Sequence, residues 1–274
     1  MKTWPNTKIP ATMDFLPVLK YLKYFLFSRH RRGYGIHSPF VFNLVSVIFR
    51  NKIEADVVCS IEAIRRNMIS NPGTIVVNDL GAGSKKMKSN LRKVSDIARY
   101  SAVSKKYGIL LANLSKAFGG QFVLEFGTSL GISTMYMAAT CPESKVCTME
   151  GCAATSALAS ENFREAGLTN IRSYTGAFDD LLPVIKGENS SPGLVFIDGN
   201  HSKEPLLSYF YKVVDMSDQN TVVVIDDIYS SQTMAEAWGE IKKHRAVTLT
   251  VDIYRMGIVF FRETGDHFHY VIRH

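Results

Sequence analysis

The sequence predicts an α/β fold: a doubly wound, mostly parallel sheet of seven strands, preceded by a helical N-terminal extension. From residue 121 onward, short runs rich in β-branched and aromatic residues alternate with longer helical stretches. Five such units follow one another, as is typical of parallel strands joined by crossover helices on both faces of a sheet. Two further strands, separated only by a turn, predict an antiparallel pair at the end of the chain.

The expected elements follow directly from this alternation. Strands are expected at 121–126, 145–150, 171–174, 193–198, 221–226, 246–253 and 257–262. Helices are expected between them at 132–140, 153–166, 178–186, 204–214 and 232–244. The last two strands would be joined by a turn around Arg255 and Met256.

The first 100 residues are expected to form a mainly helical, basic extension, and residues 101–274 the main domain. Helices are expected at 15–27, 40–49, 53–69 and 89–118, the last of them broken near Gly108. The glycine-rich stretch from Asp79 to Gly83 resembles a cofactor loop. No strand ending in an acid follows it at 20 to 25 residues, so we interpret it as a structural or substrate-side loop.

The composition is that of a globular protein. Of the 274 residues, 46% are hydrophobic and 21% charged, which excludes a disordered or collagen-like chain. The longest apolar runs are about five residues, against the 18 or more of a membrane span. The N-terminus has no apolar signal region, and the four cysteines form no CxxC pair. We therefore expect a cytoplasmic protein with reduced thiols.

The positive charge is concentrated in two segments. Residues 1–35 carry +6 and residues 84–106 carry +7, which leaves −6 for the rest of a chain whose net charge is +7. Basic segments of this kind attract phosphates or nucleic acid, although many are only solvated helix faces.

Candidate binding residues lie where the strands end, because ligands of such sheets bind beyond the carboxyl ends of the strands. The first strand ends at Glu125, and a turn from Gly127 to Gly131 leads into a helix. The second strand ends at Glu150, whose carboxylate can accept both hydroxyls of a ribose. This pattern predicts a nucleotide of the adenosine type. Glu125 would repel a pyrophosphate but suits a cationic amine, and the glycine spacing departs from GxGxxG, so S-adenosylmethionine is favoured over NAD.

The ordered set of strand ends resembles a class I methyltransferase over about residues 105–262. The residues that carry the resemblance are Glu125-Phe-Gly127-Thr-Ser-Leu-Gly131, Glu150 and Phe196-Ile-Asp198-Gly-Asn-His201. The resemblance implies the Rossmann-like methyltransferase fold with its terminal antiparallel hairpin. It also implies a set of cofactor-binding residues: Glu125, Gly127, Thr128, Ser129, Gly131, Glu150, Gly151, Ala177, Phe178 and Asp198.

Within that family the chain is most similar to small-molecule O-methyltransferases of the catechol and caffeoyl-CoA type. Those enzymes hold a divalent metal between an Asp after strand four and an Asp-Asn pair after strand five. The matching residues here are Asp198, Asp226 and Asp227, the last replacing Asn with another hard oxygen donor suited to Mg²⁺. The family's Lys base is replaced by His201, so the resemblance implies His201 and Asp198 as catalytic residues. A metal-independent site that uses His201 alone stays open.

The expected reaction is methyl transfer from S-adenosylmethionine to a hydroxyl oxygen of a small molecule. A nucleic-acid methyltransferase that uses the basic N-terminal region is an alternative. Against it, residues 198–201 are not the Pro-Pro-aromatic stretch that amine methylation of bases usually needs. A non-catalytic module that only binds the cofactor is a third possibility, and the sequence leaves a homodimer open.

Overall fold

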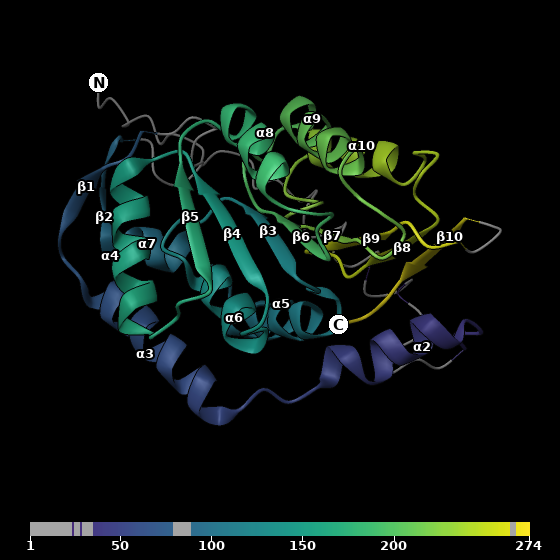
Figure 1. Cartoon of the computed structure of the whole chain (residues 1–274), viewed down its shortest axis with the longest axis horizontal. Helices are drawn as coiled ribbons and strands as arrows, with labels where there is room; N and C mark the ends of the chain where they lie inside the picture. Colours follow the sequence, from purple (N-terminus) through teal and green to yellow (C-terminus); the bar gives the residue numbers. More distant parts are fainter. Residues whose placement is uncertain (1–23, 25–27, 29–34, 79–88, 264–266) are drawn as a thin grey trace, which may run out of the picture.

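The computed structural model describes residues 24, 28, 35–78, 89–263 and 267–274 (Figure 1). Its centre is an eight-stranded sheet with the order β10-β8-β9-β7-β6-β3-β4-β5. The strands are β3 (Phe122–Phe126), β4 (Lys145–Glu150), β5 (Ile171–Thr175), β6 (Leu194–Ile197), β7 (Val222–Ile225), β8 (Leu249–Asp252), β9 (Gly257–Phe260) and β10 (Phe268–Val271). The mostly parallel sheet that the sequence predicts is confirmed.

Strand direction in the sheet changes only at β9, which pairs antiparallel with both β7 and β8. The predicted hairpin therefore exists, and its turn contains Tyr254 with a left-handed backbone (φ 71°). The eighth strand, β10, pairs parallel with β8 and was not expected. It is a short edge strand with mostly exposed side chains, so it lacks the buried apolar run that reveals the other strands.

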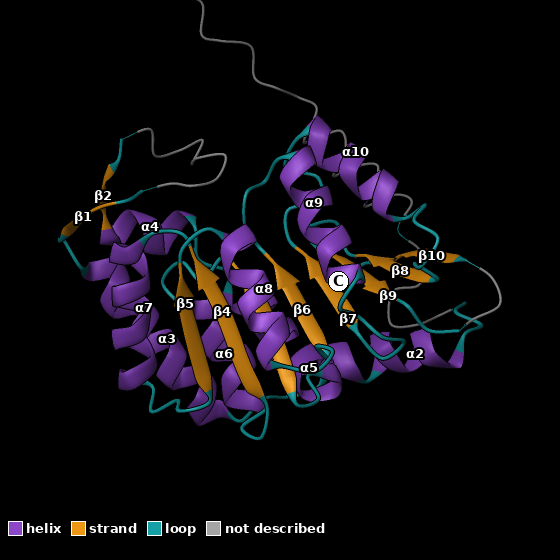
Figure 2. Cartoon of the chain, turned by 45° about the horizontal axis from the view of Figure 1, so that its top comes forward, coloured by secondary structure: helices purple, strands orange, loops and turns teal. Residues whose placement is uncertain are grey.

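Helices cover both faces of the sheet (Figure 2). One layer contains α8 (Phe178–Glu188), α9 (Lys203–Val214) and α10 (Gln232–Ile241). The other contains α5 (Lys105–Phe118), α6 (Ile132–Thr140) and α7 (Ala153–Glu165). The alternation of β3 explains the two cores: Leu124 packs with the first layer and Val123 with the second.

The N-terminal helices share the core of the second layer. They are α2 (Pro39–Ser46), a 3₁₀ turn η2 (Ile48–Arg50) and α3 (Ala55–Ser70), and their buried side chains join those of α5 and α6. The expected helices at 40–49 and 53–69 thus exist with small shifts. The helix expected at 15–27 and the Asp79–Gly83 loop lie outside the described residues, apart from Tyr24, which is helical. The division at residue 100 stays a prediction.

The helix expected at 89–118 is correct for most of its residues but wrong at its start and in the place of its break. Residues Leu91–Lys93 form β2, which pairs antiparallel with β1 (Thr74–Val76). A short helix α4 (Val94–Tyr100) follows, and α5 begins only at Lys105, after Ser104 in an extended conformation. Gly108 does not break the helix. It lies inside α5, where a Cβ would approach the ring of Tyr136 to 2.5 Å, so a close helix contact requires glycine there.

No helix in the described part of the chain is long and apolar enough to span a membrane.

Candidate functional site

The turn after β3 depends on two glycines with left-handed backbones. Gly127 has φ 96°, and a Cβ on it would lie 2.4 Å from the carbonyl oxygen of Asp198. Gly131 has φ 80°, and a Cβ there would lie 2.3 Å from the ring of Phe163. The ends of β3 and β6 can therefore approach closely, and α6 begins tightly packed against α7.

A cavity of about 760 Å³ lies at the carboxyl ends of the central strands. This volume is within the range of small-molecule and cofactor sites. Seven of the predicted cofactor residues line the cavity: Gly127, Ser129, Glu150, Gly151, Ala177, Phe178 and Asp198. Thr128 lines a small adjoining hollow together with Ser133 and Asp198. Gly131 and Glu125 line neither.

Glu150 is held at the cavity wall by two backbone N–H groups. Ser129 donates to Oε2 at 2.7 Å, and Cys152 donates to Oε1 at 2.9 Å. The carboxylate is therefore fixed in orientation, and the remaining lone pairs of its two oxygens are the acceptors it offers to a ligand. The glycine turn and the end of β4 thus form one hydrogen-bonded unit.

Glu125 is fully buried beneath the turn and does not line the cavity. Its carboxyl group accepts hydrogen bonds from the hydroxyls of Ser133 at 2.5 Å, Thr148 at 2.7 Å and Thr134. Burial raises the pKa of Glu125 to about 7, against the opposing effect of these hydrogen bonds. Ser133 also lines the adjoining hollow, so Glu125 contacts a residue of that hollow without lining it itself.

Ser133, Thr134 and Thr148 were not singled out from the sequence. The available signal was the position of Ser133 and Thr134 in the first turn of the helix after the glycine turn, on the side that faces the end of β3. Thr148 lies directly opposite Glu125 in the register of β3 and β4.

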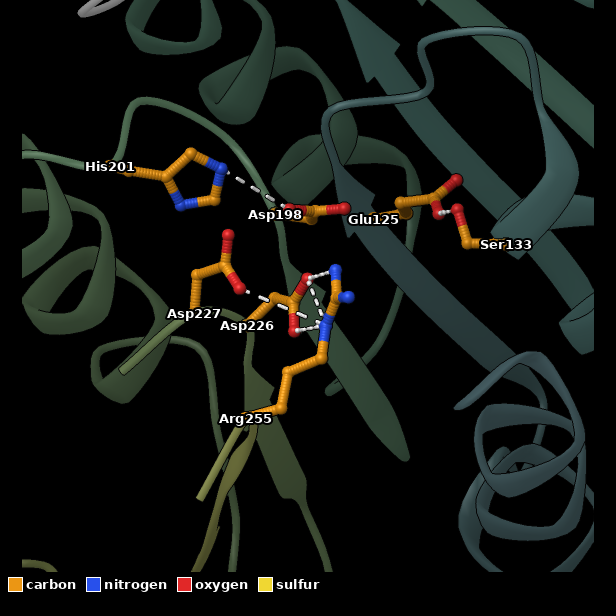
Figure 3. A network of polar contacts seen from close by, with 7 residues as sticks. All are labelled: Glu125, Ser133, Asp198, His201, Asp226, Asp227 and Arg255. Carbon is orange, nitrogen blue, oxygen red and sulfur yellow. Dashed lines mark hydrogen bonds and ion pairs between the residues drawn. The ribbon is translucent and has the colours of Figure 1, made fainter. Parts of the chain in front are cut away.

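The three aspartates predicted as metal ligands lie at the neighbouring ends of β6 and β7 (Figure 3). Asp198 lines the cavity, and its Oδ1 lies 3.5 Å from Nε2 of His201. Asp227 and His201 also line the cavity, and Asp226 is buried. Burial raises the pKa of Asp198 well above its ordinary value, and the negative charges of Asp226 and Asp227 raise it further.

Arg255 occupies the space beside this acidic group. Its Nε lies 3.0 Å from Oδ1 of Asp226, and one terminal nitrogen lies 2.7 Å from Oδ2. The same Nε is 3.7 Å from Oδ1 of Asp227. Within the described ranges, no group of three or more His, Cys, Asp or Glu side chains is arranged to hold a metal ion. The structure thus places the three carboxylates near one another, but around a guanidinium.

Arg255 was expected only as a residue of the final turn. Its role depends on the pairing of β9 with β7, which brings the turn between β8 and β9 beside the end of β7. The sequence around Arg255 does not by itself predict the pairing of β9 with β7.

Comparison with known proteins finds methyltransferases. Residues 124–228 match a family model described as a methyltransferase domain. A catechol O-methyltransferase of Niastella koreensis is 32% identical over 130 residues, which are 46% of this chain and 58% of that protein. A catechol O-methyltransferase of Mycobacterium tuberculosis is 31% identical over 129 residues, which are 46% of this chain and 57% of that protein. The chain thus covers less than two thirds of the length of these curated relatives.

Solved structures show the same fold. The O-methyltransferase of Bacillus cereus in complex with SAH superposes with a TM-score of 0.54 at 20% identity, over 81% of this chain and 97% of that one. TomG of Streptomyces achromogenes, an O-methyltransferase involved in tomaymycin synthesis solved in complex with SAM, gives 0.55 at 18% identity, over 81% and 95%. The predicted Rossmann-like methyltransferase fold and the resemblance to class I methyltransferases are therefore confirmed.

Proposed function

We propose that this chain transfers the methyl group of S-adenosylmethionine to a hydroxyl oxygen of a small molecule. The observation that carries the proposal is that the glycine turn, Glu150 and Asp198 line a single cavity at the carboxyl edge of the sheet. Ligands of doubly wound sheets bind at this edge. The names of the relatives, catechol O-methyltransferases, support oxygen as the acceptor and a small molecule as its carrier.

In this proposal Glu150 accepts the two ribose hydroxyls. The backbone donors from Ser129 and Cys152 hold its carboxylate in place before the cofactor arrives, which reduces the ordering cost of binding. Ala177 and Phe178 line the cavity after β5 and are the proposed adenine contacts. The Phe178 ring is fixed by edge contacts with Phe126 and Tyr209, at centroid distances of 5.6 and 5.5 Å.

The charged end of the cofactor would lie toward Thr128, Ser133 and Asp198, which line the adjoining hollow. Asp198 supplies a nearby carboxyl group for the ammonium. Glu125 acts indirectly: its carboxyl group accepts a hydrogen bond from the Ser133 hydroxyl and so fixes the orientation of that hydroxyl. We therefore propose Glu125 as a positioning residue of the turn, and Gly131 as the residue that allows α6 to start there.

His201 is the proposed base. S-adenosylmethionine supplies an electrophilic methyl group on a positively charged sulfur. The acceptor oxygen attacks the methyl carbon, the carbon–sulfur bond breaks toward sulfur, and the hydroxyl proton passes to His201. Asp198, 3.5 Å from Nε2, stabilises the imidazolium that forms. No covalent intermediate with the protein is required.

The donor set does not fit the divalent cation that the resemblance implies. Both oxygens of Asp226 accept hydrogen bonds from Arg255, and Asp227 also faces that guanidinium. A cation bound by Asp198, Asp226 and Asp227 would have to displace Arg255. We therefore assign no step of the reaction to a metal ion.

The experiment that tests the proposal is a transfer assay with S-adenosylmethionine labelled in its methyl group. The wild-type protein would be incubated with catechols, other phenols and sugars, and products would be identified by mass spectrometry. We expect a methyl ether from at least one hydroxyl compound, and none with Glu150→Ala. Cofactor binding without transfer to any member of the panel would favour a non-catalytic module instead.

Nucleic acid as the acceptor rests on the basic segments 1–35 and 84–106. Most of the first segment lies outside the described residues, whereas residues 89–106 of the second are described. Binding to RNA or DNA that weakens steeply with salt would support it. Sedimentation of the full chain would test the homodimer that the sequence leaves open.

A further inference from the structure

Arg255 is anchored more firmly than a surface arginine. Two of its nitrogens bond the buried carboxylate of Asp226, and its guanidinium lies 5.3 Å from the centre of the Tyr107 ring. The backbone N–H of Ile228 donates to its carbonyl oxygen at 3.2 Å, which ties the turn between β8 and β9 to the end of β7. The left-handed backbone of Tyr254 sets the direction in which the turn presents Arg255. These contacts come from separate elements and hold the guanidinium in one place.

The guanidinium is nevertheless open to the cavity. Its side chain is 31% exposed and lines the cavity together with Asp198, Asp227 and His201. Figure 3 shows dashed lines to two of its nitrogens, whereas the remaining terminal nitrogen has none. No hydrogen bond from that nitrogen to any described residue is present. Arg255 therefore offers the cavity an N–H donor in addition to its charge.

The charges of the site explain why a cation belongs here. Three carboxylates converge at the ends of β6 and β7, and one of them is buried in the sheet. Carboxylates this close repel one another unless a cation lies between them, and the repulsion is strongest at Asp226, which is shielded from water, whereas the Asp227 side chain is 38% exposed. A divalent ion would meet this need, but it would be repelled by a fixed guanidinium and would find both oxygens of Asp226 already bonded.

We propose that Arg255 is the resident cation of this site, in the place of a divalent metal ion, and that its remaining N–H donor faces the acceptor oxygen. The first part stands on the geometry alone, whereas the second rests on the proposed function. Methyl transfer by this chain would then be independent of divalent metals. The positive charge that stabilises a developing oxyanion would come from a side chain that cannot be removed by a chelator.

The test is a Mn²⁺ titration of the full chain, followed by electron paramagnetic resonance of the free ion, with and without S-adenosylmethionine. We expect no stoichiometric binding by the wild-type protein. Arg255→Met removes the charge with little loss of volume, and we expect it to bind one Mn²⁺ with a Kd below about 1 mM, the weak end of carboxylate sites. Adding Asp227→Asn to that variant should abolish the binding. Arg172→Met, which removes an arginine paired with Glu188 on the surface, is the matched control and should bind none.

Two results would overturn the proposal. One is a wild-type protein that binds one Mn²⁺ and loses it on Asp227→Asn. The other is a folded Arg255→Met protein that binds none. Should Arg255→Met fail to fold, the wild-type titration decides alone. Cofactor binding is measured separately by calorimetry, so a protein that binds neither Mn²⁺ nor S-adenosylmethionine would refute the proposed function and leave the resident cation standing.

Discussion

Replacing Glu150 by glutamine tests the cofactor site at its best-defined contact. Each carboxylate oxygen of Glu150 already accepts one backbone N–H, from Ser129 at 2.7 Å and from Cys152 at 2.9 Å. In Glu150→Gln one oxygen becomes an NH₂ group that must face a backbone donor, and the negative charge is lost. The change is therefore small in volume but disrupts both the support of the side chain and its proposed bond to a ribose.

The expected loss follows from the hydrogen bonds involved. A hydrogen bond to a charged group contributes about 1.5–3 kcal/mol, so losing one at a ribose hydroxyl weakens binding about 10- to 150-fold. Isothermal calorimetry with S-adenosylmethionine measures this directly. Glu188→Gln is the matched control, because Glu188 bonds Tyr174 and Arg172 at the surface and does not line the cavity. An affinity of folded Glu150→Gln within about twofold of that control would refute the reasoning.

Three further outcomes are expected. Gly127→Ala forces a Cβ to within 2.4 Å of a carbonyl oxygen at φ 96°, and should cost on the order of 2–4 kcal/mol of unfolding free energy by urea denaturation. Gly187→Ala is the control, because Gly187 lies in α8 and a Cβ on it would meet open space. Equal stabilities of the two variants would contradict the argument that Gly127 needs a glycine. Because burial raises the pKa of Glu125 to about 7, the native state keeps a proton that the unfolded state releases, so wild-type stability should fall as pH rises from about 4.5 to 7. Between pH 4.5 and 8, the unfolding free energy of Glu125→Gln should increase by on the order of 3 kcal/mol relative to that of the wild type. A difference between the two proteins that does not change with pH would show that the pKa of Glu125 is not raised. His201→Asn should slow transfer about 10²- to 10⁴-fold while cofactor affinity stays unchanged, and a rate close to wild type would remove His201 as the base.

The sequence predicts the sheet and the cavity wall well, because both depend on local patterns. The short, β-branched run of Val222 to Ile225 favours a buried central strand, and α6 begins and ends at the expected residues. The short strands β1, β2 and β10 were missed, because three or four partly exposed residues carry no clear period.

The site was predicted less completely, because its chemistry depends on neighbours in space. The sequence shows which acidic residues end the strands. It does not show whether each carboxylate faces the cavity or is bonded to a neighbouring hydroxyl. Glu125 was expected to touch the cofactor, and the structure shows it bonded to Ser133, Thr134 and Thr148 below the turn. Asp226 was expected beside a metal, but it is bonded to Arg255. Arg255 lies in the turn between β8 and β9, and the pairing of β9 with β7 brings that turn beside Asp226.

The most direct test of the central claim is a calorimetric titration of the wild-type chain with S-adenosylmethionine in buffer containing EDTA. The structure predicts binding of one molecule per chain, unaffected by the chelator. An absence of binding heat at millimolar cofactor, or binding that appears only after a divalent metal is added, would contradict it.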